Sequence, residues 1–191
     1  TRLGGNDCEV CRNCGRDEQE MKKIIVIGCP GSGKSIFSKA LHNCTGIPLY
    51  HLDMMFWNAD KTTVEKSVFL DRLSAVLEKD EWIIDGNYGR TLEMRLEKCD
   101  KVFLFDLPTD VCLKGAESRI GNKREDMPWI EEEFDPEFKV WIENFKRDEM
   151  PHVYSRLEKY KNKDITVFSS REEADEYLIM VNESRNLQVS T

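Results

Sequence analysis

Residues 28–35 read Gly-Cys-Pro-Gly-Ser-Gly-Lys-Ser, and this octapeptide constrains the chain more than any other feature. It matches the phosphate-loop pattern G-x-x-x-x-G-K-[ST] at every fixed position. Residues 24–27 precede it as a β-branched apolar run, which is typical of a buried parallel strand. Residues 36–44 follow it with apolar side chains at helical spacing. Because strand, glycine loop and helix come in the required order, the segment predicts a nucleotide-binding site.

The residue types of the loop suit a bound phosphate. Its glycines permit backbone angles closed to other residues, so main-chain N–H groups and the helix N-terminus can face an anion. Lys34 is expected to reach the β- and γ-phosphates, and the Ser35 hydroxyl to ligate Mg²⁺. The expected ligands are therefore ATP and Mg²⁺. The predicted cofactor-binding residues are Gly28, Pro30, Gly31, Ser32, Gly33, Lys34 and Ser35.

Composition restricts the class of protein further. The chain has 191 residues with 40% hydrophobic content, which suits one domain with one substantial core. Its net charge of −8 disfavours broad attraction to nucleic acid or to an anionic membrane. Four scattered cysteines (residues 29, 44, 99 and 112), together with the nucleotide-binding signature, suggest reduced thiols and a cytoplasmic location. Composition does not specify the oligomeric state.

Residues 1–20 differ in character from the rest of the chain. They are polar, lack apolar periodicity and are expected to form a disordered extension, with Met21 as the natural start of the domain. Cys8, Cys11 and Cys14 form a C-x-x-C-x-x-C run, which begins like an iron–sulfur binding segment but lacks a fourth cysteine at position 18. Weak metal binding and an incidental cluster both remain open for these thiols.

Strand and helix patterns alternate along residues 21–181, which predicts an α/β fold with a parallel sheet covered on both faces. Helices are expected at 64–77, 91–98 and 109–119, and around residues 138–145, 153–160 and 174–181. Further strands are expected at 47–52, 82–84, 102–105 and 165–168. The irregular stretch between about residues 120 and 136 is long for a connection and predicts a lid. Residues 182–191 are expected to form a loose tail.

The ordered set of motifs resembles the adenylate kinase-like P-loop kinases, and more closely the bacterial DNA topology modulation proteins. The resemblance covers nearly all of residues 21–181. It implies a three-layer α/β sandwich around a five-stranded parallel sheet in the order 2-3-1-4-5, and ATP-dependent phosphoryl transfer to a small acceptor. The segments that carry it are 28–35, Tyr-His-Leu-Asp at 50–53, Trp-Ile-Ile-Asp-Gly-Asn-Tyr at 82–88, 102–108 and 134–145.

Acidic residues that follow the expected strands are candidates for the metal and the acceptor. Asp85 ends a buried strand and is expected to hold Mg²⁺ with Ser35, although a strand-end turn also explains a carboxylate there. Asp106 is the rival metal carboxylate. Asp53 is expected to orient an acceptor hydroxyl or act as its base, against the alternative of a helix cap. His51 is interpreted as structural.

Arginines supply the expected positive charge. In the resembling kinases an arginine after Asp-Gly holds the acceptor, which implies this role for Arg90, although the intervening residues depart from that pattern. Lid arginines close over the nucleotide there, which implies that Arg119 or Arg124 does so here. Arg171 is expected either to approach the adenine or simply to start a helix. The stripe of Phe138, Trp141 and Phe145 is interpreted as core.

The leading hypothesis is a P-loop kinase that transfers the γ-phosphoryl group of ATP to a small molecule such as a nucleotide or nucleoside. Its predicted catalytic residues are Lys34, Asp53, Arg90, Arg119 and Arg124. The alternative is a nucleotide-dependent regulatory protein that influences DNA topology without acceptor chemistry. The negative net charge disfavours direct DNA binding, and the sequence contains no apparent DNA-recognition motif.

Overall fold

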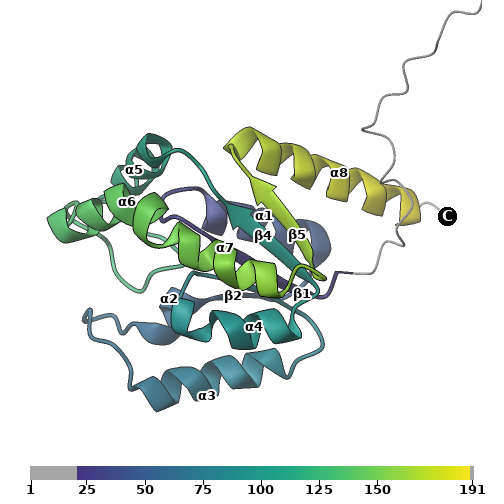
Figure 1. Cartoon of the computed structure of the whole chain (residues 1–191), viewed down its shortest axis with the longest axis horizontal. Coiled ribbons are helices and arrows are strands. Elements are labelled where there is room, and N and C mark those ends of the chain that lie inside the picture. The colour runs from purple at the N-terminus through teal and green to yellow at the C-terminus, as the bar shows by residue number, and fades with distance from the viewer. Residues whose placement is uncertain (1–20, 190–191) are drawn as a thin grey trace, which may run out of the picture.

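A five-stranded parallel sheet in the order β2-β3-β1-β4-β5 forms the centre of the protein (Figure 1). The computed structural model describes the backbone of residues 21–189 and the side chains of residues 21–185. The strands are β1 (Lys23–Gly28), β2 (Leu49–His51), β3 (Trp82–Asp85), β4 (Lys101–Phe105) and β5 (Asp164–Phe168). The predicted fold class and strand order are therefore confirmed.

Helices cover both faces of the sheet, as Figure 1 shows, with α1 and α8 on one face and α4 and α7 on the other. A single turn of 3₁₀ helix, Gly89–Thr91, precedes α4. None of the helices in residues 21–189 is long and apolar enough to span a membrane. The helices are α1 (Lys34–Thr45), α2 (Leu52–Phe56), α3 (Lys66–Leu77), α4 (Leu92–Lys98), α5 (Thr109–Glu117), α6 (Pro136–Asp148), α7 (Met150–Lys159) and α8 (Arg171–Val189).

The central strand β1 explains why the phosphate loop is rigidly placed. Residues 24–27 are fully buried, as expected for a parallel strand that has helices on both faces. β1 pairs with β3 and with β4, so that Val26 lies opposite Asp85 and Gly28 opposite Phe105. The carboxyl ends of these strands therefore meet at one edge of the sheet, where open α/β folds bind ligands.

Helix boundaries follow local capping chemistry. The side chain of Asp135 accepts hydrogen bonds from the backbone N–H groups of Glu137 and Phe138, and Pro136 occupies the first turn of α6. Helix α1 ends at Gly46, whose φ of 75° lies in the left-handed region and whose N–H bonds the carbonyl of His42. These caps fix where the irregular connection gives way to α6 and where α1 stops.

Two boundaries differ from the sequence prediction. The strand expected at 47–52 is shorter, and Asp53 lies in the first turn of α2 rather than beyond a strand end. Helix α8 continues to Val189, so most of the segment expected to be a loose tail is helical. Arg185 of that segment donates to the carbonyls of Cys44 and Thr45 at the end of α1, a contact that no local pattern announces.

The connection between α5 and α6 spans residues 118–135, and its irregular part, 121–135, lies at the position predicted for a lid. The connection is held to the rest of the protein by aromatic contact, because the rings of Trp57 and Trp129 pack edge to face at 5.4 Å. The predicted extension 1–20, including Cys8, Cys11 and Cys14, lies outside the described residues.

Candidate active site

The phosphate loop between β1 and α1 needs its glycines for steric reasons. Gly28 has a φ of 137°, and a Cβ atom there would lie 2.3 Å from the carbonyl oxygen of Phe105. Gly31 has a φ of 78°, and its Cβ would lie 2.0 Å from the carbonyl oxygen of Cys112. No side chain fits at such distances, so these positions require glycine. The loop is thereby pressed against β4 and α5.

Lys34 is the charged side chain of the loop, and it is 7% exposed. Its ammonium Nζ donates to the carbonyl oxygen of Cys29 at 2.7 Å, which curls the side chain back over the loop. Burial lowers the pKa of Lys34, and the charge of Asp85 opposes that shift. Because α1 begins at this residue, the first N–H groups of the helix have no partner within it and are oriented to bind an anion.

Two side chains from distant elements brace the loop. The Asn87 side chain accepts from the N–H of Gly28 at 2.8 Å and donates to its carbonyl at 2.6 Å, which ties the end of β3 to the start of the loop. Arg171, the first residue of α8, donates to the carbonyls of Gly31 and Ser32. Arg171 therefore holds the back of the loop as well as starting a helix.

Asp85 ends β3 beside the phosphate loop and is 5% exposed. Its Oδ2 accepts a hydrogen bond from Nδ1 of His51 at 3.0 Å, whereas its Oδ1 is buried and has no hydrogen-bond partner among residues 21–185. A buried carboxylate oxygen is costly to leave unsatisfied, and a metal ion satisfies it. Asp85 and the neighbouring Ser35 are oxygen ligands of the kind that Mg²⁺ takes, so the residues present fit this cation.

Asp53 lies in the cleft with one identified partner. The hydroxyl of Tyr88 donates to its Oδ1 at 2.7 Å. Burial raises the pKa of Asp53, and the hydrogen bond from Tyr88 offsets part of that rise. A carboxylate whose pKa is raised toward the working pH is suited to accept a proton from an alcohol.

A buried arginine shapes the loop that carries Asn87 and Tyr88. Arg95 of α4 is fully buried, and burial lowers its pKa to about 9. Its guanidinium donates to the carbonyls of Gly86, Asn87 and Tyr88, and its Nε to that of Thr91. One side chain thus donates hydrogen bonds to four backbone carbonyl groups of the turn that follows β3, and these bonds fix the direction of Tyr88.

The two predicted lid arginines differ in their surroundings. Arg124 is held in a bidentate pair by Asp126 and by a second pair with Glu131 at 2.8 Å. The side chain of Arg119 forms no hydrogen bond or ion pair with the described residues, and burial lowers its pKa, with the charge of Arg124 adding to the shift. Of these two arginines, Arg119 is therefore the one whose N–H groups are available to bind a ligand.

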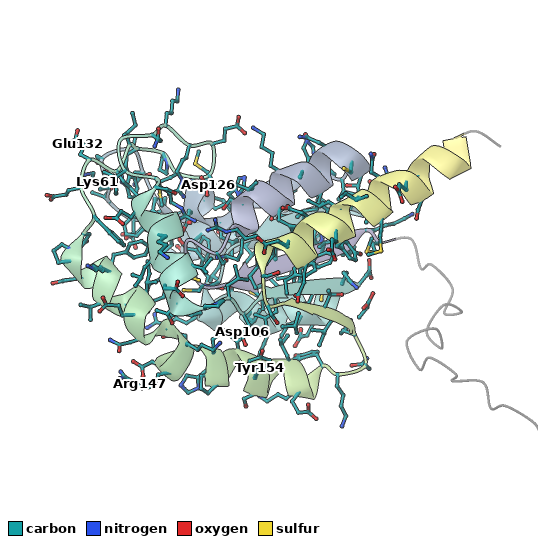
Figure 2. All side chains as sticks on the ribbon, turned by 90° about the horizontal axis from the view of Figure 1, so that it is seen from above. Lys61, Asp106, Asp126, Glu132, Arg147 and Tyr154 are labelled. Atoms are coloured by element: carbon teal, nitrogen blue, oxygen red, sulfur yellow. The ribbon has the colours of Figure 1, made fainter. Side chains whose placement is uncertain are left out.

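A cleft of about 1410 Å³ joins these groups. In Figure 2, Lys61, Asp126 and Glu132 lie at one end of the molecule, where the cleft opens between α2, α6 and the connection 121–135. The cleft brings together seven of the predicted site residues, namely Pro30, Lys34, Ser35, Asp53, Asp85, Arg119 and Arg124. The glycines and Ser32 form the loop behind them.

Arg90 does not join this group. It is exposed on the turn Gly89–Thr91 and does not line the cleft, so the structure gives no support to the acceptor role implied by resemblance. Arg156 of α7 lines the cleft instead, close to Gly89. The reason is geometric, since the positive φ of Tyr88 (33°) turns the chain so that Tyr88 faces Asp53 and Arg90 faces solvent.

The rival metal carboxylate and the aromatic stripe are also placed by the structure. Asp106 accepts from the Tyr154 hydroxyl and pairs with Lys146, and it lies away from the cleft, beside Tyr154 in Figure 2. Phe145 is buried as expected for core, but Trp141 is 40% exposed and lines the cleft together with Phe138. Phe138 is partly buried and packs against the core, and Phe145 lines the cleft as well. The interpretation of the stripe as core is therefore wrong for Trp141 alone of the three.

The structure brings further residues to the site that the sequence does not indicate. His51 is interpreted from the sequence as structural and Asp126 has no predicted role, yet both lie in one cluster with Asp85. Only the closeness of Asp126 to Arg124 in a charged stretch hinted at its role. Asn87 and Arg95 gave no local signal, because their partners are backbone groups that only the folded chain brings near.

The sheet order, the glycine loop and the cleft at the carboxyl edge together define the P-loop kinase fold. No protein-family model and no curated protein sequence matches the chain. Among solved structures, the chain is similar to shikimate kinase from Bacteroides thetaiotaomicron, with 16% identity and a TM-score of 0.54 over 87% of this chain and 99% of that one. It is also similar to shikimate kinase from Acinetobacter baumannii in complex with shikimate, with 11% identity and a TM-score of 0.55 over 86% and 95% of the two chains. At these identities the likeness shows the fold.

Proposed function

We propose that the protein is a kinase that transfers the γ-phosphoryl group of ATP to a hydroxyl group of a small molecule. One observation carries the proposal. The phosphate loop with Lys34 and the proton acceptor Asp53 line the same cleft, so a nucleotide and an acceptor can meet there. Both solved neighbours named above are kinases of a small hydroxylated acid, which supports a small acceptor.

The side chains divide the reaction between them. Loop N–H groups and Lys34 would hold the β- and γ-phosphates, while Ser35 and Asp85 would hold Mg²⁺, which neutralises phosphate charge when bound. Asp53 would take the proton of the acceptor hydroxyl, whose oxygen forms the new bond to phosphorus as ADP leaves. Arg119, whose side chain bonds to none of the described residues, would stabilise the charge on the moving phosphoryl group.

The acceptor is proposed as a nucleotide, a nucleoside or a small hydroxylated acid. Aromatic side chains at the open end of the cleft favour an acceptor with a flat face, because Trp57, Trp129 and Trp141 all line it. Arg156 is a further donor on the same wall, and its one bond within the described residues is a long contact to the carbonyl of His152. It suits an anionic group of the acceptor.

Acceptor-dependent release of ADP tests the proposal. The protein is mixed with Mg²⁺-ATP and a panel of nucleosides, nucleotides and hydroxylated acids that includes shikimate. We expect one class to accelerate ADP release, and Lys34→Ala to reduce that rate by about 10²–10³-fold or more, because it removes a charge that the transition state needs. Lys159→Ala is the control, since this exposed lysine pairs with Glu93 away from the cleft. Equal turnover by the Lys34 variant, confirmed as folded, would remove the mechanism.

A further inference from the structure

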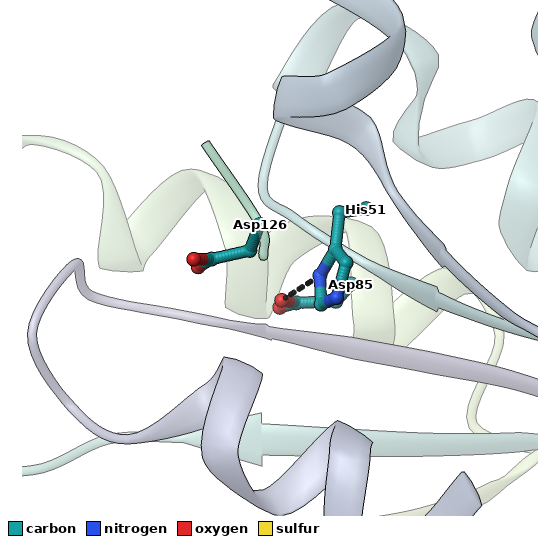
Figure 3. A group of neighbouring side chains, drawn as sticks. All are labelled: His51, Asp85 and Asp126. Carbon is teal, nitrogen blue, oxygen red and sulfur yellow. Dashed lines mark hydrogen bonds and ion pairs between the residues drawn. The ribbon is translucent and has the colours of Figure 1, made fainter. Parts of the chain in front are cut away.

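A histidine and two carboxylates converge beside the phosphate loop. His51 comes from the end of β2, Asp85 from the end of β3, and Asp126 from the connection 121–135 (Figure 3). One ligand atom of each lies within 4.8 Å of the others, and no other such group of three or more occurs among the described residues. Three separate segments of chain are needed to build this cluster.

The cluster is buried, and it is not self-sufficient. Asp85 and Asp126 are 5% and 8% exposed, and the His51 side chain is 16% exposed. The Oδ1 atom of Asp85 has no hydrogen-bond partner, although its Oδ2 is bonded by His51. A bound cation would satisfy a carboxylate oxygen that is buried in this way. The cluster offers such a cation two carboxylate ligands.

The distances suit a small divalent ion. Two neighbouring ligands at right angles, each about 2.1 Å from a metal, lie about 3.0 Å apart. The Nδ1 atom of His51 and the Oδ2 atom of Asp85 are separated by 3.0 Å. A metal ion can therefore replace the proton that these two atoms share, and Asp126 needs only a small side-chain movement to become the third ligand.

The groups around Asp126 orient it for this task. Arg124 donates to both of its carboxylate oxygens at 2.9 Å. Outer partners of this kind fix the direction of a metal ligand. Asp126 and Ser35 line the same cleft, so the cluster lies beside the phosphate loop.

We propose that the metal site beside the phosphate loop also takes a divalent first-row transition ion, such as Mn²⁺ or Co²⁺, and binds it more tightly than Mg²⁺, with His51 as a nitrogen ligand and Asp85 and Asp126 as oxygen ligands. The inference rests on the proposed function, because the ion accompanies the nucleotide at the loop. The imidazole is the reason for the choice. Mg²⁺ prefers oxygen ligands and water, whereas a mixed nitrogen and oxygen set favours transition ions. Binding also requires that His51 is neutral, so the metal competes with a proton.

Electron spin echo spectroscopy of the Mn²⁺–ADP complex tests the assignment. The full chain is prepared with ¹⁴N-histidine and, separately, with ¹⁵N-histidine. We expect modulation from a directly bound histidine nitrogen that changes with the label, and that disappears in His51→Gln. His152→Gln is the matched control and keeps the signal, since His152 is exposed and does not line the cleft. The labelling comparison on the unmodified protein needs no variant to fold.

Affinity gives a second readout. His51→Gln should weaken Mn²⁺ binding to the ADP complex by about tenfold or more, the scale seen when the shell of a metal is altered, with little change for Mg²⁺. A Mn²⁺–ADP complex without histidine modulation overturns the assignment of His51 and leaves the proposed kinase intact. Failure of the protein to bind Mn²⁺–ADP at all overturns both.

Discussion

Two charged side chains in the cleft have pKa values that burial shifts toward neutrality. Burial lowers the pKa of Lys34 and raises that of Asp53, because each ionised form loses contact with water. Within the described part of the chain each has one hydrogen-bond partner, the carbonyl of Cys29 for Lys34 and the hydroxyl of Tyr88 for Asp53. Such groups cost stability, and they are typical of sites that act on a ligand.

Asp53→Asn should separate stability from activity. The raised pKa of Asp53 means that its ionised form destabilises the folded state above that pKa, and that the cost disappears below the unfolded value. Asparagine keeps the acceptor for Tyr88 without the charge. We therefore expect the variant to resist urea slightly better than the parent protein at about pH 7, with the advantage fading toward about pH 4.

The kcat of the Asp53→Asn variant should fall, although its stability rises. Loss of the proton acceptor should lower kcat by about 10²–10⁴-fold. Urea unfolding at both pH values and the kcat for the acceptor found in the screen measure the two effects. A variant with undiminished kcat would show that Asp53 takes no proton. A stability advantage over the parent protein that is smaller at about pH 7 than at about pH 4 would contradict the pKa direction.

The element that organises the acceptor side is the turn between β3 and α4. Hydrogen bonds from the Arg95 side chain and between the Asn87 side chain and Gly28 set the path of this turn. The turn therefore connects the phosphate loop with Tyr88 and, through it, with Asp53. The same turn exposes Arg90, so its geometry decides which side chains can reach an acceptor.

Arg95→Met should show the dependence of the site on this turn. The substitution keeps much of the side-chain volume but leaves the carbonyls of Gly86, Asn87 and Tyr88 without their donor. We expect a loss of roughly 2–4 kcal/mol in unfolding free energy, the scale of several unmade hydrogen bonds, and a raised KM for the acceptor. Arg72→Met is the control, because that exposed arginine makes a single bond to the carbonyl of Met55. Equal changes in unfolding free energy and in KM for the two substitutions would show that the site does not depend on the hydrogen bonds of Arg95.

At the scale of the whole molecule, the positive charge of the cleft is local. The chain carries a net charge of −8, and carboxylates outnumber cations along the cleft. Lys34 and Arg119 also line the cleft, and neither forms an ion pair with a carboxylate of the described residues. This arrangement suits a small anionic ligand such as a nucleotide, and it disfavours a long polyanion, which needs an extended basic surface.

A DNA-binding measurement tests the alternative of a regulatory protein that acts on DNA. We expect no binding to a labelled duplex at physiological salt, with or without ATP, in fluorescence anisotropy. Any weak binding at low salt should show a shallow salt dependence, because few phosphates can be neutralised at once. Tight binding with a steep salt slope would favour the regulatory protein over the kinase.

The sequence by itself determined the phosphate loop and the presence of a parallel sheet, since both leave a pattern within short segments of the chain. The glycines, Lys34 and Ser35 stand at set spacings, and continuous β-branched runs are stable where helices cover both faces of a strand. The confirmed strand order came from the resemblance, which rested on the same ordered motifs.

Only the tertiary structure decided which distant side chains meet. Asp126 reaches His51 and Asp85 because the connection between α5 and α6 returns over the ends of two strands. Arg90 falls outside the cleft because one residue with positive φ turns the chain there. Such contacts depend on loop dihedral angles and on packing between segments far apart in sequence, and neither leaves a periodic trace along the chain.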